Sequence, residues 1–181
     1  MVRTRVGYAG GTQKDPTYYK LGDHTETIQI DYDPTRISYE ELLAIFWDSH
    51  NPANPPFSRQ YKSIIFYHNE AQKKLALETK AHVEAELNAS VLTEIIPVSE
   101  FYLAEAYHQK NYLQGVPQFK QEFSAIYPDI NDFIASTSVA RVNGYLGGNG
   151  TVASLQAEIE SFGLSPEAKQ KLLDIVSSLN N

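Results

Sequence analysis

The absence of cysteine constrains this chain more than any other feature of its sequence. None of its 181 residues is a cysteine, which excludes disulfide bonds, thiolate zinc sites, iron–sulfur clusters and thiol nucleophiles from these residues. The fold must therefore depend on a hydrophobic core. A chain of this length buries about 70% of its unfolded surface, and its 42% hydrophobic and 20% charged residues are ordinary globular values. We expect one compact domain with an appendage.

The charge balance excludes two classes of partner. The chain has 15 Lys and Arg against 22 Asp and Glu, a net charge of −7, and no basic stripe of the kind that binds nucleic acid or anionic lipid. No apolar run approaches the roughly 20 residues of a membrane span, and the first residues lack the apolar stretch of a signal peptide. We therefore expect a cytoplasmic protein with neither a nucleic-acid nor a membrane partner.

Two segments near the start of the chain alternate between apolar and polar residues, as strands do. One covers residues 2–8, and the other covers residues 24–32 and places Glu26 on the same face as Ile28. Because terminal residues usually fray, a strand at the second residue predicts that the chain as written begins inside a sheet. Two later strands are expected over residues 61–67 and 93–98.

Helix start signals mark the segments between and after these strands. Ser38 and Glu41 form a capping box that starts a helix ending near His50, and Asn69 can cap a long helix that reaches about Leu87. Shorter helices are expected over residues 105–112, 117–126 and 132–142.

A glycine-rich segment near residue 146 predicts the domain organisation. We expect a main domain over residues 1–145, a linker over 146–150 and a helical C-terminal extension over 151–181. Ser165 and Pro166 have the residue types that open a helix, so the extension is expected to end in one.

Glu26 is the strongest candidate for chemistry. A carboxylate on an apolar strand face is desolvated, and desolvation favours the protonated form that a general acid needs. The alternative is a side chain that turns to solvent or pairs with Arg3 or Arg5 on a neighbouring strand. Tyr18 and Tyr61 lie beside turns, where a hydroxyl can reach a cleft, although most tyrosines are packing residues.

His24 shares the strand of Glu26 and could supply a second metal ligand. The other histidines lie in separate elements, and the chain has no His-Glu-x-x-His motif. We therefore expect no metal site and interpret His24 as a histidine at the end of a strand.

Short motifs follow one another in a specific order from the first residues to about Tyr112. They are Thr4-Arg5-Val6-Gly7-Tyr8-Ala9-Gly10-Gly11, Asp15-Pro16-Thr17-Tyr18, His24-Thr25-Glu26, Tyr32-Asp33-Pro34, Ile37-Ser38-Tyr39-Glu40-Glu41-Leu42-Leu43, Phe46-Trp47 and Tyr107-His108-Gln109. Together they resemble the type A peptide methionine sulfoxide reductase (MsrA) family.

The resemblance implies an α/β (α+β) fold with a ferredoxin-like mixed sheet and flanking helices. It also implies an oxidoreductase that reduces methionine (S)-sulfoxide, free or in proteins, to methionine. In that chemistry a cysteine thiolate attacks the sulfoxide sulfur, a glutamic acid protonates the oxygen, and an external thiol, thioredoxin or dithiothreitol, regenerates the cysteine. By resemblance, Glu26 is the general acid, and Tyr18 and Tyr61 hydrogen-bond the sulfoxide oxygen. No bound cofactor is implied.

The sequence departs from the family at three places. The Gly-Cys-Phe-Trp signature that carries the nucleophile normally lies upstream of Thr4, and it is absent. The loop before Tyr61 has Pro55-Pro56-Phe57-Ser58-Arg59-Gln60 in place of a stretch with a substrate-binding aspartate, and the cysteine-containing tail is replaced. We therefore expect the first strand and helix of the domain to be missing and the chain as written to be inactive.

Two other functions are consistent with the same residues. One is a cysteine-free pseudo-enzyme that binds methionine sulfoxide or peptides without reducing them. The other is a protein-interaction module in which residues 151–181 dock a partner.

Overall fold

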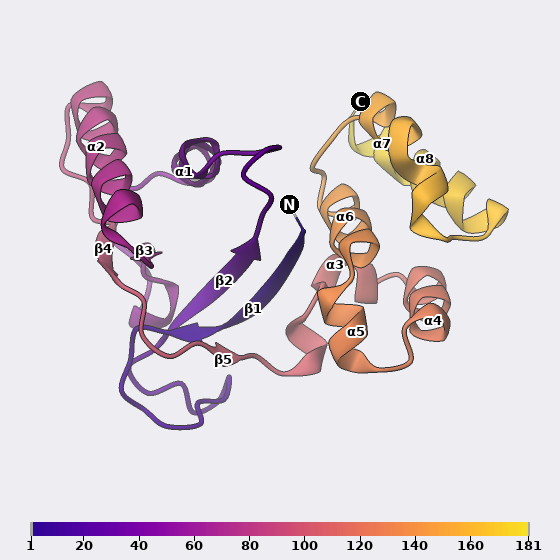
Figure 1. The fold of residues 1–181 in the computed structure, drawn as a ribbon, viewed down its shortest axis with the longest axis horizontal. Coiled ribbons are helices and arrows are strands. Elements are labelled where there is room, and N and C mark those ends of the chain that lie inside the picture. The colour runs from indigo at the N-terminus through magenta and orange to yellow at the C-terminus, as the bar shows by residue number, and fades with distance from the viewer. Residues whose placement is uncertain (1, 181) are drawn as a thin grey trace. The chain divides into compact units, whose positions relative to one another are not determined.

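The computed structural model describes residues 2–180 and divides into two compact units. One unit consists of residues 6–104, and the other of residues 105–181 with the first five residues (Figure 1). No helix in the described part of the chain has the length and apolar character to cross a membrane.

The unit of residues 6–104 contains two small sheets. Strands β1 (Arg3–Ala9), β2 (Thr25–Asp31) and β5 (Tyr102–Leu103) form one sheet in the order β2-β1-β5, in which β1 and β5 are antiparallel. Strands β3 (Ile64–Tyr67) and β4 (Glu94–Pro97) form the other and run parallel. Among the described residues, β2 and β3 therefore each pair along one edge only.

Two helices complete this unit, and both begin at the predicted caps. Helix α1 (Tyr39–Asp48) starts at Ser38, whose hydroxyl accepts from the Glu41 amide while the Glu41 carboxylate accepts from the Ser38 amide. Helix α2 (Glu70–Leu87) starts at Asn69. The two helices pack on β3 through a shared core, which consists of Leu43, Trp47, Ile65, Ala76 and Val91.

The other unit is helical. It contains α3 (Asn111–Gln114), α4 (Pro117–Ile126), α5 (Ile130–Ala135), α6 (Thr137–Leu146), α7 (Val152–Glu158) and α8 (Pro166–Leu179), with 3-10 turns at Ala106–His108 and Ile159–Phe162. One core joins these helices, and its fully buried members include Phe119 on α4, Leu155 on α7 and Leu172 on α8.

The chain divides at a different place from the glycine-rich segment. Residues 151–181 share the core of α3 to α6, so they are part of the helical unit and not a separate extension. Gly147 ends α6, where its amide donates to the Asn143 carbonyl. Residues 146–150 therefore form the turn between two packed helices, and the division lies at residue 105.

The predicted mixed α/β class is confirmed, with three local differences. The expected strand over 61–67 begins at Ile64, because residues 59–61 form a 3-10 turn. The expected helix over 132–142 is interrupted at Ser136, whose hydroxyl accepts from the Val139 amide and starts α6. The expected single mixed sheet is replaced, in the described residues, by two sheets.

Candidate functional site

Glu26 is the second residue of β2, and its carboxylate is exposed. The expectation of burial is therefore wrong. The alternation correctly placed Glu26 and Ile28 on one face, but that face is uncovered in the described residues and Ile28 is 56% exposed. The partner that the structure gives this carboxylate is Gln60, whose Nε2 donates a hydrogen bond to Oε1 at 2.5 Å.

A short 3-10 turn, η1 (Arg59–Tyr61), holds Gln60 beside this strand. The Thr25 hydroxyl donates to the Arg59 carbonyl at 3.1 Å. The Arg59 Nε donates to the Asp23 carbonyl at 2.9 Å. Two contacts to residues just before Glu26 in sequence thus fix the turn, and with it both Gln60 and Tyr61, against the start of β2.

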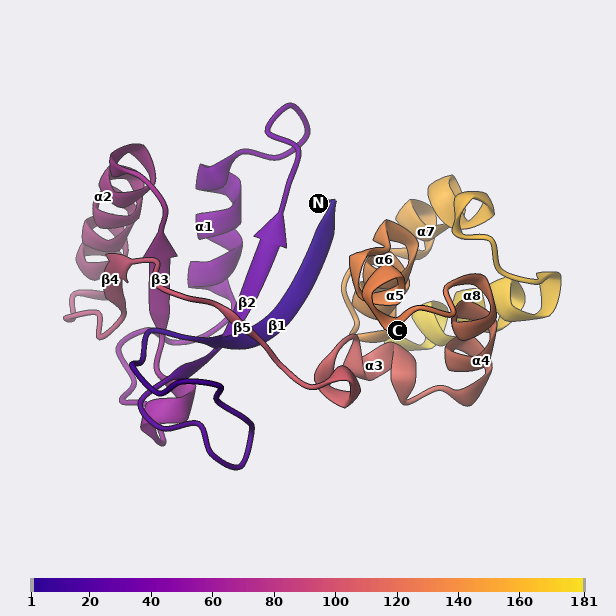
Figure 2. The same ribbon diagram turned by 60° about the horizontal axis from the view of Figure 1, so that its bottom comes forward.

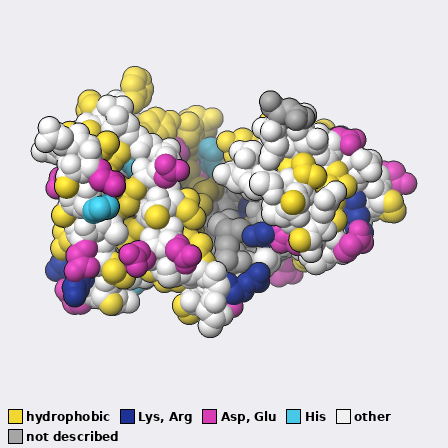
Figure 3. Space-filling view, turned by 90° about the horizontal axis from the view of Figure 1, so that it is seen from above, with side chains coloured by type: hydrophobic (Ala, Val, Ile, Leu, Met, Phe, Trp, Pro, Cys, Tyr) yellow, Lys and Arg dark blue, Asp and Glu magenta, His cyan; other side chains and the backbone are white. Residues whose placement is uncertain are grey.

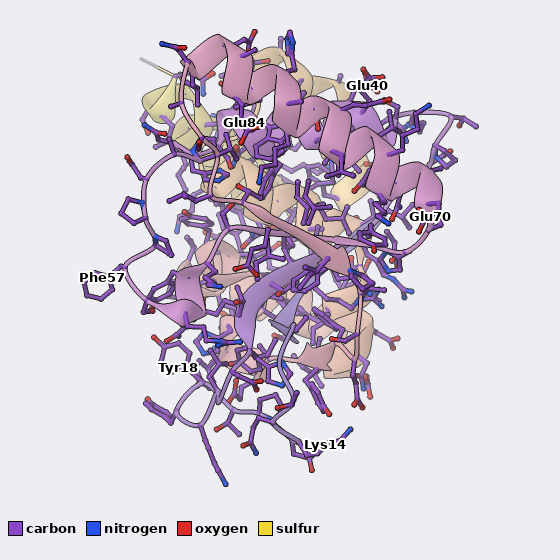
Figure 4. All side chains as sticks on the ribbon, turned by 90° about the vertical axis from the view of Figure 1, so that its left-hand side faces the viewer. Lys14, Tyr18, Glu40, Phe57, Glu70 and Glu84 are labelled. Atoms are coloured by element: carbon purple, nitrogen blue, oxygen red, sulfur yellow. The ribbon has the colours of Figure 1, made fainter. Side chains whose placement is uncertain are left out.

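Tyr18 and Tyr61 meet at this position. The two side chains are hydrogen-bonded, which raises the pKa of the Tyr61 phenol above its ordinary value, and the nearby charge of Glu26 raises it further. Tyr18 is half-buried and Tyr61 is 50% exposed. Figure 4 shows Tyr18 and Phe57, four residues before Tyr61, projecting from different loops on the same side of the unit. Glu26, Tyr18 and Tyr61, the three site residues predicted from the sequence, therefore lie in one cluster.

The loop that carries Tyr18 is fixed by Asp23 and His24. The Asp23 carboxylate accepts from the backbone amides of Thr12 at 2.7 Å and Gln13 at 3.1 Å. These bonds lower the pKa of Asp23 from 3.8 to about 2. Since a Cβ on Gly11 would lie 2.6 Å from the Asp23 Oδ1, this close approach requires glycine.

His24 has a structural role in the same loop. Its Nδ1 accepts from the Gly11 amide at 3.1 Å, and its Nε2 donates to the Gln13 carbonyl at 2.8 Å. The side chain is buried, with both ring nitrogens engaged by the backbone. The interpretation of His24 as a residue at the end of a strand is consistent with this environment, because neither nitrogen is left to bind a cation.

An apolar groove of about 320 Å³ lies between β2 and β3, with α1 over the space between them (Figure 2). Glu26 lies among its lining residues. The Tyr39 hydroxyl is buried there without a hydrogen-bond partner among the described residues, and burial raises the pKa of this phenol. The apolar lining residues include Ile28, Ile30, Leu42, Phe46, Ile64 and Phe66. On the face of this unit that Figure 3 shows, hydrophobic and acidic side chains are interspersed.

Sequence reasoning identified neither Gln60 nor the groove. Gln60 is 34 positions from Glu26, and only the folded path of η1 brings its amide to the carboxylate. The groove depends on the separation of two sheets. Two features of the sequence could have indicated the groove: the apolar residues on one face of β2, and the strand periodicity that begins at the second residue.

Comparison with known proteins agrees with the motifs. The family model described as peptide methionine sulfoxide reductase matches residues 1–151. The Drosophila melanogaster peptide methionine sulfoxide reductase is 44% identical over 172 residues, which cover 94% of this chain and 69% of that protein. The rice (Oryza sativa subsp. japonica) peptide methionine sulfoxide reductase A5 is 39% identical over 151 residues, which cover 80% of this chain and 59% of that protein.

Solved structures give the same result. The reduced form of Mxr1 from Saccharomyces cerevisiae has a TM-score of 0.58 at 30% identity, covering 64% of this chain and 71% of that one. Methionine sulfoxide reductase A of Corynebacterium diphtheriae has a TM-score of 0.55 at 28% identity, covering 65% of each chain. The motifs, the match over residues 1–151 and the Drosophila relative together show that this chain belongs to the peptide methionine sulfoxide reductase family.

Proposed function

We propose that Glu26, Tyr18 and Tyr61 form the oxygen-binding half of a peptide-methionine (S)-S-oxide reductase site. The observation that carries the proposal is the convergence of these three side chains, which come from β2 and from two different loops. The substrate is methionine sulfoxide, free or in proteins. Family members act on this group and use thiol reductants.

The reaction transfers one oxygen atom from the substrate to a thiol. A cysteine thiolate attacks the sulfoxide sulfur while Glu26 gives a proton to the sulfoxide oxygen. The sulfur–oxygen bond breaks, the substrate leaves as methionine, and the cysteine becomes a sulfenic acid. Two thiols, for which we propose thioredoxin or dithiothreitol, then reduce the sulfenic acid to the thiol with release of water and formation of a disulfide.

The thiol must come from outside these residues, because none of the 181 is a cysteine. We infer that the groove between β2 and β3 receives the segment that carries it. Each strand has one unpaired edge among the described residues, and an extended segment between them would gain backbone hydrogen bonds from both. It would also cover Ile28 and remove Glu26 from water, which favours the protonated acid.

Adding the missing group tests this proposal. The chain is produced with an upstream Gly-Cys-Phe-Trp segment and, as the matched control, with Gly-Ser-Phe-Trp. With dithiothreitol and a methionine-sulfoxide peptide, we expect turnover from the cysteine version, loss of at least about 100-fold with Glu26→Ala, and none from the serine version or the 181-residue chain. A cysteine version that binds the peptide but does not reduce it contradicts the proposed reductase site, and unchanged turnover in Glu26→Ala contradicts the assignment of Glu26.

The absence of cysteine also favours a second function, in which the 181-residue chain only binds methionine sulfoxide. Calorimetry with a peptide that contains (S)-sulfoxide, compared with its methionine form, tests this. Selective affinity that is lost in Tyr61→Phe supports the binding function, and equal affinity for both peptides eliminates it. The integration of residues 151–181 into the helical core removes the main argument for an interaction tail.

A further inference from the structure

We propose that Gln60 is a positioning residue for Glu26, and that its side-chain amide determines which carboxyl oxygen carries the proton. This inference rests on the proposed function, because it assigns a role to the general acid of that site. The observation is the hydrogen bond from Gln60 Nε2 to Glu26 Oε1.

The chemistry of an amide nitrogen makes this contact directional. An amide NH₂ group only donates, so the oxygen that faces it must offer a lone pair. When Glu26 is protonated, Oε1 therefore remains the acceptor and the proton lies on Oε2. The oxygen that can donate to a sulfoxide is thus selected before substrate binds, and such preorganisation lowers the cost of reaching the transition state.

The backbone beneath Gln60 is well fixed. The Tyr61 amide donates to the Ser58 carbonyl at 3.1 Å, which closes the turn. The bonds of Thr25 and Arg59 described above attach that turn to β2 on the N-terminal side of Glu26. The same turn holds Tyr61, so one element sets the positions of the carboxyl group and of a hydroxyl that would bind the same oxygen.

The cations nearby have other partners. Arg59, the neighbour of Gln60, directs its guanidinium to the Asp23 carbonyl, and Lys62 forms an ion pair with Glu94. A lysine or arginine bonded to Glu26 would stabilise the ionised carboxylate and remove the proton that the reaction needs. A neutral amide can hold the carboxyl group in place without adding this charge.

The contact can be tested in the 181-residue chain by NMR. We expect the side-chain amide protons of Gln60 to shift as the pH is lowered from neutral, and to lose this response in Glu26→Gln. Gln114, whose side-chain amide donates to backbone carbonyls, is the internal control. A Gln60 resonance that does not respond to pH, or that is the same in Glu26→Gln, overturns the proposal and indicates a reversed amide or a broken contact.

Two variants separate positioning from simple tethering. Gln60→Met removes the donor at similar volume, and we expect it to weaken binding of N-acetyl-methionine-(S)-sulfoxide methylamide about 3- to 10-fold in acidic buffer, in which the carboxyl group can carry the proton. Gln60→Lys restores a donor but adds a charge, and we expect binding at least as weak as that of Gln60→Met. If Gln60→Lys binds the sulfoxide with wild-type affinity, any donor to Oε1 is sufficient, and the proposal is overturned.

The two arms distinguish this inference from the proposed function. If the wild-type chain has no affinity for the sulfoxide, the binding-only function fails, while turnover of the cysteine version still tests the reductase site and the NMR titration still determines whether Gln60 orients Glu26. Gln60 is half-buried on a surface turn, and thermal unfolding monitored by Trp47 fluorescence verifies that each variant is folded.

Discussion

At the scale of single residues, the bond between Tyr18 and Tyr61 gives the first prediction. Their hydrogen bond is the largest cause of the raised pKa of the Tyr61 phenol. Tyr18→Phe removes it, so we expect the pKa of Tyr61 to fall toward the ordinary value for tyrosine. Labelling tyrosine ring carbons with ¹³C and titrating by NMR measures this, and Tyr61→Phe assigns the resonance. An unchanged titration of Tyr61 in Tyr18→Phe contradicts the contact.

The ionised form of Asp23 stabilises the folded state, which gives a prediction about acid. Backbone hydrogen bonds from Thr12 and Gln13 lower the pKa of Asp23 from 3.8 to about 2. A lowered carboxyl pKa contributes stability that is present above about pH 4 and is lost as the pH falls toward about 2. We expect the melting temperature of the wild type to fall more steeply over this range than that of Asp23→Asn.

Trp47 makes this measurement specific to the unit that contains Asp23, because it is the chain's single tryptophan and lies in the core of residues 6–104. Other carboxylates titrate in both proteins, so only the difference between the two curves reports Asp23. Parallel curves for wild type and Asp23→Asn would mean that the charge of Asp23 does not hold the loop.

For single residues, the sequence predicts which side chains share one face of a strand, but it does not predict whether that face is buried. Strand periodicity placed Glu26 and Ile28 on one face correctly, because alternation is a local property of the backbone. Whether that face is covered depends on distant segments, and here the described residues leave it open. Gln60 escaped notice for the same reason, since nothing in its own neighbourhood indicates a partner on β2.

At the scale of elements, the capping box of α1 gives a matched pair of variants. The Ser38 hydroxyl accepts from the Glu41 amide at 3.1 Å. Ser38→Ala removes this hydrogen bond and should lower the free energy of unfolding by about 1 kcal/mol. Ser58 precedes the turn η1 without a side-chain cap, so Ser58→Ala is the control and should have little effect. Denaturant unfolding followed by Trp47 fluorescence measures both, and equal effects would contradict the cap.

Helix boundaries were predicted where a local signal defines them. Ser38 and Asn69 cap α1 and α2 at the expected residues, and α4 covers the expected 117–126. Ser136 shows the limit of this approach, because its hydroxyl starts a new helix inside a segment with continuous helical periodicity. Strand β5 has only two residues and exists through its pairing with β1, so no local pattern could indicate it.

At the scale of the whole chain, tertiary packing determined what glycine content could not. Four glycines between residues 144 and 150 suggested a flexible linker, yet α6 and α7 on either side contribute to one core. The division into two units lies at residue 105, in a segment without glycine or proline. Glycine content indicates where the backbone can bend, whereas the burial of side chains in a shared core decides where one compact unit ends.

Long-range bonds to the first residues give the last prediction, which concerns Lys110. Its Nζ donates to the Thr4 carbonyl and, at 2.9 Å, to the Thr4 hydroxyl. Burial lowers the pKa of Lys110 from 10.5 to about 8, and the charge of Arg5 contributes in the same direction. The folded state therefore disfavours the charged form, and between about pH 8 and pH 10 the unfolded chain binds more protons. By linkage, stability rises with pH over this range, by at most about 1.4 kcal/mol per pH unit.

Lys110→Met tests this linkage, and Lys120→Met on the exposed face of α4 is the matched control. Far-ultraviolet circular dichroism follows the melting temperature of the helical unit. We expect this temperature to rise with pH in wild type and in Lys120→Met, when each is compared with Lys110→Met at the same pH. The range ends near pH 10, because the lysine of the unfolded chain, with an ordinary pKa of 10.5, then begins to lose its proton as well. If wild type and Lys110→Met have the same pH dependence, Lys110 keeps its charge in the fold.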